Sequence, residues 1–258
     1  MIRRYSARDI EKWADYSGDR NKVHFDKAFA IKNGLKDIIV QGMLTLLDAK
    51  VMITPWLKTH SSLDFYIKNP VSMNTDVQFT LKEGENKQTL TIAESQNPEA
   101  VCVTATLLAQ KPPNLPKSAT RIPISDEFIQ MHLESLKSHY PHISHNWLLM
   151  DTLLFSICFN QRKDDYFHQQ ALKISKHHRY DNITTYHVAQ KLFISEQLIV
   201  GGDINFSEIS FFIEDKDIYI DNDSAYNIFN IHAVQQGTII FQSSIGCMTK
   251  ASRRELEI

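Results

Sequence analysis

The residues best suited to chemistry lie in one short stretch near the N-terminus, residues 17–26, which reads SGDRNKVHFD. Asp19, Asn21, His24 and Asp26 place an acid, an amide, an imidazole and a second acid within eight residues. The stretch shows neither a helical nor a strand period. A glycine followed by clustered polar residues predicts a shaped polar loop rather than a packed element.

Asp19 and His24 are the candidate acid–base pair. A carboxylate and an imidazole five residues apart on a curved loop can hold one water molecule between them. An imidazole takes or gives a proton near neutral pH, and a carboxylate accepts from water or orients it. Asn21 lies between them and offers both donor and acceptor groups, which can fix either the loop or the water. Such a set suits general acid–base catalysis.

Gly42 is the candidate hydrogen-bond donor. It opens a long apolar stretch, and we expect a helix from Gly42 to Leu57 that is wrapped by other structure. Backbone N–H groups at a helix N-terminus carry partial positive charge, and glycine permits close approach because it has no Cβ. The N–H of Gly42 is therefore predicted to stabilise negative charge that develops in the reaction.

Residues 17–26 resemble the signature of the MaoC-like, (R)-specific enoyl-CoA hydratases, which reads Ser-Gly-Asp-x-Asn-Pro-(aliphatic)-His-x-Asp. The following Phe29-Ala30, Gly34 and Gly42-Met43 also fall where that family has these residues. The resemblance covers the first 45 residues closely, and the rest of the chain only through the order of helices and strands.

The resemblance implies an α+β fold, a double hot-dog in which two long helices are each wrapped by an antiparallel sheet. It implies reversible addition of water to a trans-2-enoyl thioester of coenzyme A or acyl carrier protein, giving the (R)-3-hydroxyacyl thioester in fatty-acid or polyketide-type metabolism. The resemblance also implies that the catalytic residues are Asp19, Asn21, His24 and Gly42. It implies neither a cofactor nor a metal, because the thioester itself is the substrate.

Two residues depart from the family pattern. Lys22 replaces the usual proline, which frees one φ angle and loosens the loop. Gln41 replaces a histidine that commonly precedes the glycine. The candidate acid and imidazole are kept, so the departures bear on the substrate more than on the type of reaction.

Other readings of these residues stay open. A thioesterase on the same fold would act on the thioester carbon and release a thiol, and a non-catalytic module would bind acyl thioesters without turnover. His24 could also be an idle residue of a purely structural loop, and Asp26 is expected to cap the helix that follows it. A calcium loop is excluded, since its sixth and twelfth positions would be His24 and Ala30 rather than Gly and Glu.

The first half of the chain has the elements to position this loop. A helix is expected at 6–15 with Ser6 as its N-cap, and a second at 27–33. Alternating apolar residues and turn signals predict strands at 62–68, 77–82, 89–95 and 100–110.

The proline-rich stretch 111–117 is the clearest linker, so we expect an N-terminal hot-dog domain at 1–112 and a degenerate one at 117–258. Apolar patterns predict helices at 125–139 and 146–160 and strands at 171–177, 184–195, 204–214, 224–233 and 238–248.

The second half repeats the plan of the first. The long helices begin at Gly42 and Asn146, 104 positions apart, which indicates a duplicated unit. No residues ahead of Asn146 match the Asp19, Asn21, His24 pattern, so only the first half is expected to be active. The other half would take the place of a second subunit and shape the acyl pocket, and two such chains could form a homodimer.

Composition narrows the partners. The formal net charge is −2 and no basic run is long, which argues against nucleic acid as a partner. Three cysteines far apart in sequence indicate buried reduced thiols rather than disulfides or a zinc site. The N-terminus carries charge without an apolar run behind it, and no stretch is long and apolar enough to span a bilayer. A cytoplasmic protein without membrane contact is therefore expected.

Overall fold

The computed structural model describes residues 1–85, 87–161, 180–202, 204–221 and 224–253. The elements of the first half are β1 (Ile2–Arg4), α1 (Ala7–Ser17), the 3₁₀ helix η1 (Lys22–His24), α2 (Lys27–Lys32), α3 (Gly42–Ile53), η2 (Thr54–Trp56), β2 (Ser61–Ile67), β3 (Asp76–Glu83), β4 (Gln88–Glu94) and β5 (Asn97–Ala109). Those of the second half are β6 (Thr120–Ile122), α4 (Asp126–His139), α5 (Asn146–Gln161), β7 (Tyr180–Ile194), α7 (Glu196–Val200), η3 (Phe206–Glu208), β8 (Ser210–Asp221), β9 (Ser224–Gln235) and β10 (Thr238–Arg253).

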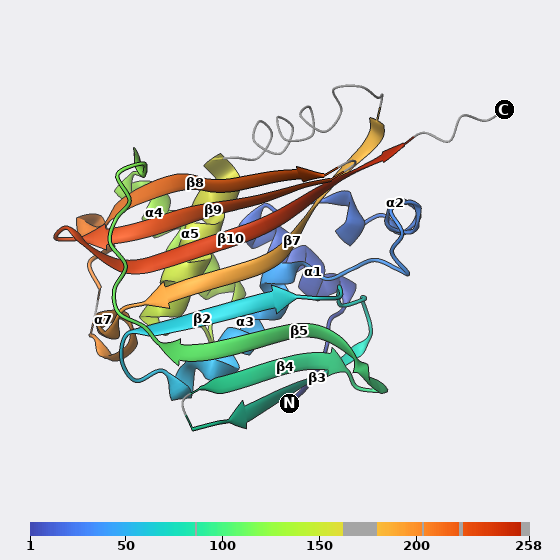
Figure 1. Ribbon diagram of the computed structural model, residues 1–258, viewed down its shortest axis with the longest axis horizontal. Helices are drawn as coiled ribbons and strands as arrows, with labels where there is room; N and C mark the ends of the chain where they lie inside the picture. Colours follow the sequence, from blue (N-terminus) through green and yellow to red (C-terminus); the bar gives the residue numbers. More distant parts are fainter. Residues whose placement is uncertain (86, 162–179, 203, 222–223, 254–258) are drawn as a thin grey trace.

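The ten strands of the described residues form one antiparallel sheet in the order β1-β3-β4-β5-β2-β7-β10-β9-β8-β6 (Figure 1). Read outward from the central β2–β7 pair, the two halves have the same order, with β7 in the place of β2 and β10 in the place of β5. The duplicated plan predicted from the helix starts is therefore present in the strand topology.

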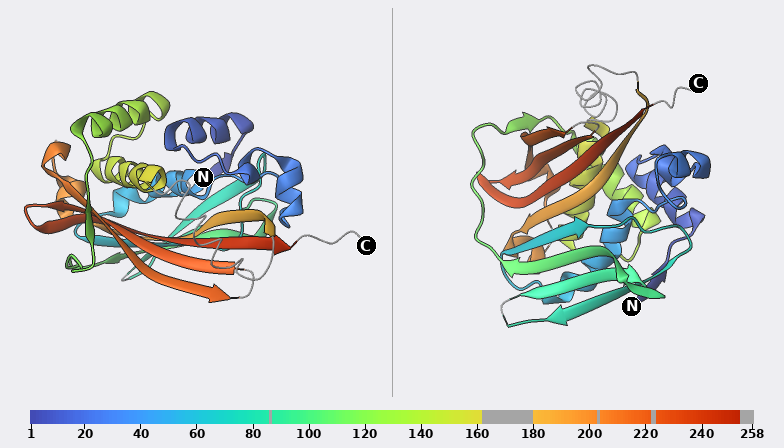
Figure 2. Two further views of the ribbon diagram at one scale, coloured as in Figure 1. Left: turned by 90° about the horizontal axis from the view of Figure 1, so that it is seen from above. Right: turned by 45° about the vertical axis from the view of Figure 1, so that its right-hand side comes forward.

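The helices lie on one face of the sheet in two layers (Figure 2). The long helices α3 and α5 lie against the strands, and α1 and α4 cover them from outside. Apolar residues are spread round much of the circumference of α3, which suits a helix in contact with structure on most sides. Each long helix is wrapped by its own half of the sheet, which is the predicted double hot-dog.

A buried ion pair joins the two long helices. The Nζ atom of Lys50 on α3 lies 2.5 Å from Oδ2 of Asp151 on α5, and both side chains are fully buried. Gln190 of β7 accepts from Lys50 at 2.7 Å and donates to Asp151 at 3.0 Å. Because a buried charge is costly unless it is paired, this triad fixes α3 against α5 and against the sheet.

The structure corrects several boundaries. The predicted strand at 204–214 begins only at Ser210, because Asn205 caps the 3₁₀ helix η3 by accepting from the N–H of Ser207. The long helix ends at Ile53, and Pro55 stands in the 3₁₀ turn that follows. The sequence patterns also missed the short elements β1, β6 and α7, and the strand expected at 171–177 lies outside the described residues.

Two further observations concern the cysteines and the membrane. Cys102 and Cys247 are free and buried, as expected. Among the helices in the described part of the chain, none has the length and apolar character needed to cross a membrane.

Candidate active site

The motif loop begins where α1 ends. Ser6 caps the start of α1 in a reciprocal capping box with Asp9. Gly18 ends the helix with φ 76°, a left-handed conformation that favours glycine, and its N–H donates to the carbonyl of Ala14 at 2.8 Å. The Oγ atom of Ser17 then accepts from the N–H of Asp19 at 3.1 Å. These bonds turn the chain sharply and place Asp19 at a fixed point beyond the helix.

Asn21 fixes the loop through both ends of its amide. Its Oδ1 accepts from the N–H of Val23 at 3.4 Å and caps η1, the 3₁₀ turn that contains His24. Its Nδ2 donates to the carbonyl of Thr185 at 2.9 Å, on strand β7 of the second half. Of the two uses expected for this side chain, the contacts favour holding the loop over holding a water.

Gln41 provides a further tie. Its side chain is fully buried, and its Nε2 donates to the carbonyl of Ile10 at 3.1 Å and, more weakly, to that of Asp19 at 3.5 Å. The residue that departs from the family pattern thus joins the start of α3 to α1 and to the motif loop.

His24 and Asp19 face each other inside the protein. The Nδ1 atom of His24 lies 2.7 Å from the carbonyl oxygen of Ile39. A carbonyl only accepts, so Nδ1 carries the hydrogen and the Nε2 lone pair of a neutral ring is free. Nε2 lies 3.7 Å from Oδ2 of Asp19, and the two side chains are only 8% and 14% exposed. That separation is too long for a direct hydrogen bond and suits two groups that share one water.

Gly42 is the first residue of α3, and its surroundings admit no larger side chain without movement. A Cβ atom here would lie 2.9 Å from Cδ1 of Ile67 and 3.2 Å from Nδ1 of His187. The first N–H groups of a helix have no partner within the helix and carry its partial positive charge.

One cavity of about 640 Å³ brings these residues together, since Asp19, Asn21, His24 and Gly42 all line it. The size falls within the range of small-molecule sites. Asp26 does not line it; its Oδ1 caps α2 by accepting from the N–H of Phe29 at 2.9 Å, as expected. Within the described part of the chain, no group of three or more His, Cys, Asp or Glu side chains could hold a metal ion.

The family model described as "MaoC like domain" matches residues 3–101 of the sequence. Residues 3–101 are therefore similar to MaoC-like domains. No curated protein matches the chain.

Solved structures that are similar to this chain include one described as a MaoC-like dehydratase, with a TM-score of 0.49 and 11% identity, covering 96% of this chain and 95% of that chain. The (R)-hydratase from A. caviae involved in PHA biosynthesis is 26% identical, with a TM-score of 0.31, over 43% of this chain and 92% of that one. The dehydratase domain of PpsC from Mycobacterium tuberculosis, solved in complex with C12:1-CoA, is 9% identical with a TM-score of 0.45, over 83% of this chain and 85% of that one.

The second half completes the cavity that the motif loop lines. Phe155 of α5, Phe229 of β9 and Ile245 of β10 supply apolar walls. The second half has only residues 140–145 between α4 and α5, whereas the first half has residues 18–41 between α1 and α3. The connection between α4 and α5 therefore contains no counterpart of the motif loop or of α2.

His187 is a cavity residue that the sequence did not reveal. A β-bulge at Val188 leaves Ala189 opposite Gly246 and His187 opposite Cys247. Residues three apart in a regular strand point to opposite faces, but the bulge lets both His187 and Gln190 face α3. Because the pairing of β7 with β10 joins segments far apart in sequence, no local pattern could have shown this.

The imidazole of His187 is neutral. Its Nε2 donates to the carbonyl of Ala189 at 2.9 Å, and its buried Nδ1 has no hydrogen-bond partner among the described residues. Burial, reinforced by the positive charge of Lys50, lowers the pKa of His187 to about 4. A neutral ring with its lone pair toward the α3 N-terminus suits the positive end of the helix dipole.

Proposed function

We propose that this protein catalyses the (R)-specific, reversible addition of water to trans-2-enoyl thioesters. The observation that carries the proposal is the 3.7 Å separation of Asp19 Oδ2 and His24 Nε2, in a cavity that Gly42 also lines. The reverse reaction removes water from an (R)-3-hydroxyacyl thioester. Water and the thioester are the only reactants, so the proposed reaction uses no cofactor.

The two side chains define how the water is held. An ionised Asp19 and a neutral His24 both accept hydrogen bonds, so a water between them donates one hydrogen to each. Its oxygen lone pairs then point away from both, toward the third carbon of a bound enoyl group. Holding the reactants in one orientation removes much of the entropic cost of bringing them together.

In the addition step, the water oxygen forms a bond to the third carbon while Nε2 of His24 takes one of the water's protons. The electron pair of the double bond shifts toward the carbonyl, and negative charge collects on the thioester oxygen. The N–H of Gly42 donates to that oxygen. Nε2–H then returns the proton to the second carbon, which restores neutral His24 and leaves the 3-hydroxyacyl thioester.

The walls of the cavity suit an acyl chain. Met43 and Ile67 of the first half and Phe155, Phe229 and Ile245 of the second line it. Aliphatic and aromatic side chains of this kind are compatible with a hydrocarbon tail and offer little to a polar one.

The test is hydration of crotonyl-CoA, followed by loss of the absorbance of the conjugated enoyl thioester. Wild type should turn over and give the (R) product, and His24→Ala should lose about 10²–10⁴ in rate. His145→Ala is the matched control, since His145 is exposed and precedes the long helix of the other half. Turnover by His24→Ala at the wild-type rate would contradict the proposal, as would release of free thiol in place of hydration, or tight binding without turnover.

A further inference from the structure

Asn227 of β9 has a buried side-chain amide with neither end paired. The residue is 0% exposed, and neither Oδ1 nor Nδ2 has a hydrogen-bond partner among the described residues. Burying an amide without compensating hydrogen bonds is costly, so buried amides are normally paired. Asn230 on the same strand shows that arrangement, because its Nδ2 donates to Glu214 at 3.0 Å and its Oδ1 accepts from Ser244 at 2.5 Å. Asn227 therefore keeps a donor and an acceptor that the described residues leave unused.

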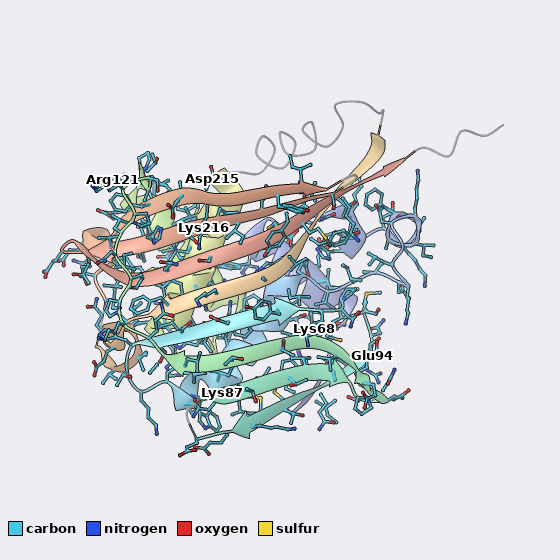
Figure 3. The ribbon with its side chains drawn as sticks, in the orientation of Figure 1. Lys68, Lys87, Glu94, Arg121, Asp215 and Lys216 are labelled. Carbon is cyan, nitrogen blue, oxygen red and sulfur yellow. The ribbon has the colours of Figure 1, made fainter. Side chains whose placement is uncertain are left out.

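The amide of Asn227 is on the cavity side of the sheet. Side chains alternate along a strand, so Asn227 shares its face with Phe229, and it stands directly opposite Cys247 of β10. Phe229 and Cys247 both line the cavity. Figure 3 is drawn from the helix-free side, so the Asn227 side chain points away from the viewer, toward the helices. The unpaired amide thus adjoins the part of the cavity that Phe229 and Cys247 line.

A row of residues connects this amide to the reacting atoms. Cys247 pairs with His187 on its other side, so His187, Cys247 and Asn227 form one row across β7, β10 and β9. His187 lies beside Gly42, whose N–H donates to the thioester oxygen in the proposed reaction. Burial, and secondly the carboxylate of Asp19, raise the pKa of Cys247 to about 12, so Asp19 is near the middle of the row. The row therefore runs from the thioester, past the water, to Asn227.

The length of this row sets where along an acyl chain the amide acts. Neighbouring strands are about 4.8 Å apart, so two strand spacings separate Asn227 from His187 by about 9–10 Å. An extended hydrocarbon chain advances about 1.3 Å per C–C bond, so about seven bonds cover the distance. A chain that begins at the thioester therefore reaches the amide near its seventh or eighth carbon.

The chemistry of the amide favours a hydroxyl as its partner. A hydroxyl fits either end of the amide, since it donates to Oδ1 or accepts from Nδ2, whereas a ketone can use only Nδ2. A carboxylate also uses only Nδ2 and would bring a buried charge. The nearby walls, with Phe155, Phe229 and Ile245, suit hydrocarbon. A single polar group in an apolar wall is how such pockets fix the orientation of a ligand.

We propose that Asn227 is a specificity residue that binds a hydroxyl group on the distal part of the acyl chain. The substrates are then enoyl thioesters whose hydrocarbon chain carries a hydroxyl near the seventh carbon, in addition to the 3-hydroxyl that hydration forms. The inference rests on the proposed function and narrows it, because the reaction itself needs no group beyond the third carbon. The distal hydroxyl takes no part in bond making and positions the chain.

The direct test is calorimetric titration with 7-hydroxyoctanoyl-CoA and octanoyl-CoA, two saturated thioesters that have no double bond to hydrate. Wild type should bind the hydroxylated thioester about 10–100-fold more tightly, because the plain chain leaves the amide unpaired. Asn227→Leu should bind both with equal affinity. The same variant should raise Tm by about 2–8 °C, since it removes an unpaired buried amide. Equal affinity of wild type for the two thioesters would overturn the inference.

Asn230→Leu is the matched control, because it makes the same change on the same strand at an amide whose two ends are paired. It should lower Tm and keep the preference for the hydroxylated chain. A preference that survives Asn227→Leu would contradict the assignment, and so would a preference that both variants lose.

A second readout uses the reactive substrates. The ratio of kcat/KM for 7-hydroxyoct-2-enoyl-CoA to kcat/KM for oct-2-enoyl-CoA should be about 10–100 in wild type and about 1 in Asn227→Leu. The two proposals fail separately. Discrimination between the saturated thioesters, with no hydration of either enoyl thioester, would refute the proposed function and keep the Asn227 site. Hydration of both enoyl thioesters with equal kcat/KM would keep the function and refute the site.

Discussion

Breaking the buried ion pair between the two long helices should cost a large part of the folding free energy. Lys50 and Asp151 are both fully buried, and Nζ lies 2.5 Å from Oδ2. Lys50→Met leaves the carboxylate without its cation, and Asp151→Leu leaves the ammonium with only neutral partners. An unpaired buried charge of this kind costs about 3–5 kcal/mol. In a chain of this size that corresponds to a fall in Tm of about 6–20 °C.

The double variant tests more directly whether the two charges are coupled. Lys50→Met with Asp151→Leu removes both charges and fills the same space with apolar atoms, so its stability should lie within about 1–2 kcal/mol of wild type. The two single losses would then not add, and the coupling energy should reach several kcal/mol. Gln190 limits the recovery, because it would lose its partner at each end of the side-chain amide.

Urea unfolding followed by circular dichroism measures all four proteins of this cycle. Control variants Lys191→Met and Asp64→Leu break an ion pair of 3.2 Å on the same sheet whose lysine is 54% exposed, and should each lose less than about 1 kcal/mol. The reasoning is that this pair is shielded from water and that its two charges depend on each other. Losses of stability in the single variants at Lys50 and Asp151 as small as those of the controls would refute it, and so would losses that simply add in the double variant.

Three further outcomes are expected. Gly42→Ala should lower kcat about 10–100-fold with little change in unfolding free energy, because the new methyl group meets Cδ1 of Ile67 at 2.9 Å beside the donor amide. A kcat equal to that of wild type would show that Gly42 is not part of the site. Asn21→Ala should lower the free energy of unfolding by about 1–2 kcal/mol, because it frees the loop from Thr185. The same change should raise KM and lower kcat together, whereas a change in kcat alone would argue against a loop-fixing role. His187 has a folded pKa of about 4, below its ordinary value, so its contribution to the free energy of unfolding is present above pH 6.5 and lost as the pH falls toward 4. Urea titrations should show wild type losing about 2–3 kcal/mol more than His187→Gln over that range. Parallel stability curves for the two proteins would contradict this expectation.

The local elements of the first half could be predicted because their signals are local. Ser6 caps α1, Asp26 caps α2, and Gly42 opens α3, each at the residue that the sequence indicated. The helix order and the spacing of Gly42 and Asn146 also indicated the duplication that the strand order now displays. The motif residues converge on one cavity because a single turn and its neighbouring helix carry all of them.

The contribution of the second half to the site depends on long-range pairing and could not be predicted. The Val188 bulge aims His187 at α3, and Thr185 holds Asn21 through a main-chain carbonyl that carries no sequence signature. The ion pair of Lys50 and Asp151 joins helices whose relative rotation no pattern specifies. The start of the strand expected from Ile204 was wrong, because a capping bond of Asn205 competes with strand pairing until Ser210.

The central claim is that Asp19 and His24 act as one unit on one water, and the most direct test is a kinetic double-mutant cycle. The measurement is kcat/KM for hydration of crotonyl-CoA by wild type, Asp19→Asn, His24→Gln and the double variant. Each single change should cost about 10²–10⁴, and the double variant should be little slower than the slower single one, because either change already releases the water. Losses that multiply in the double variant, or a His24→Gln enzyme within tenfold of wild type, would contradict the claim.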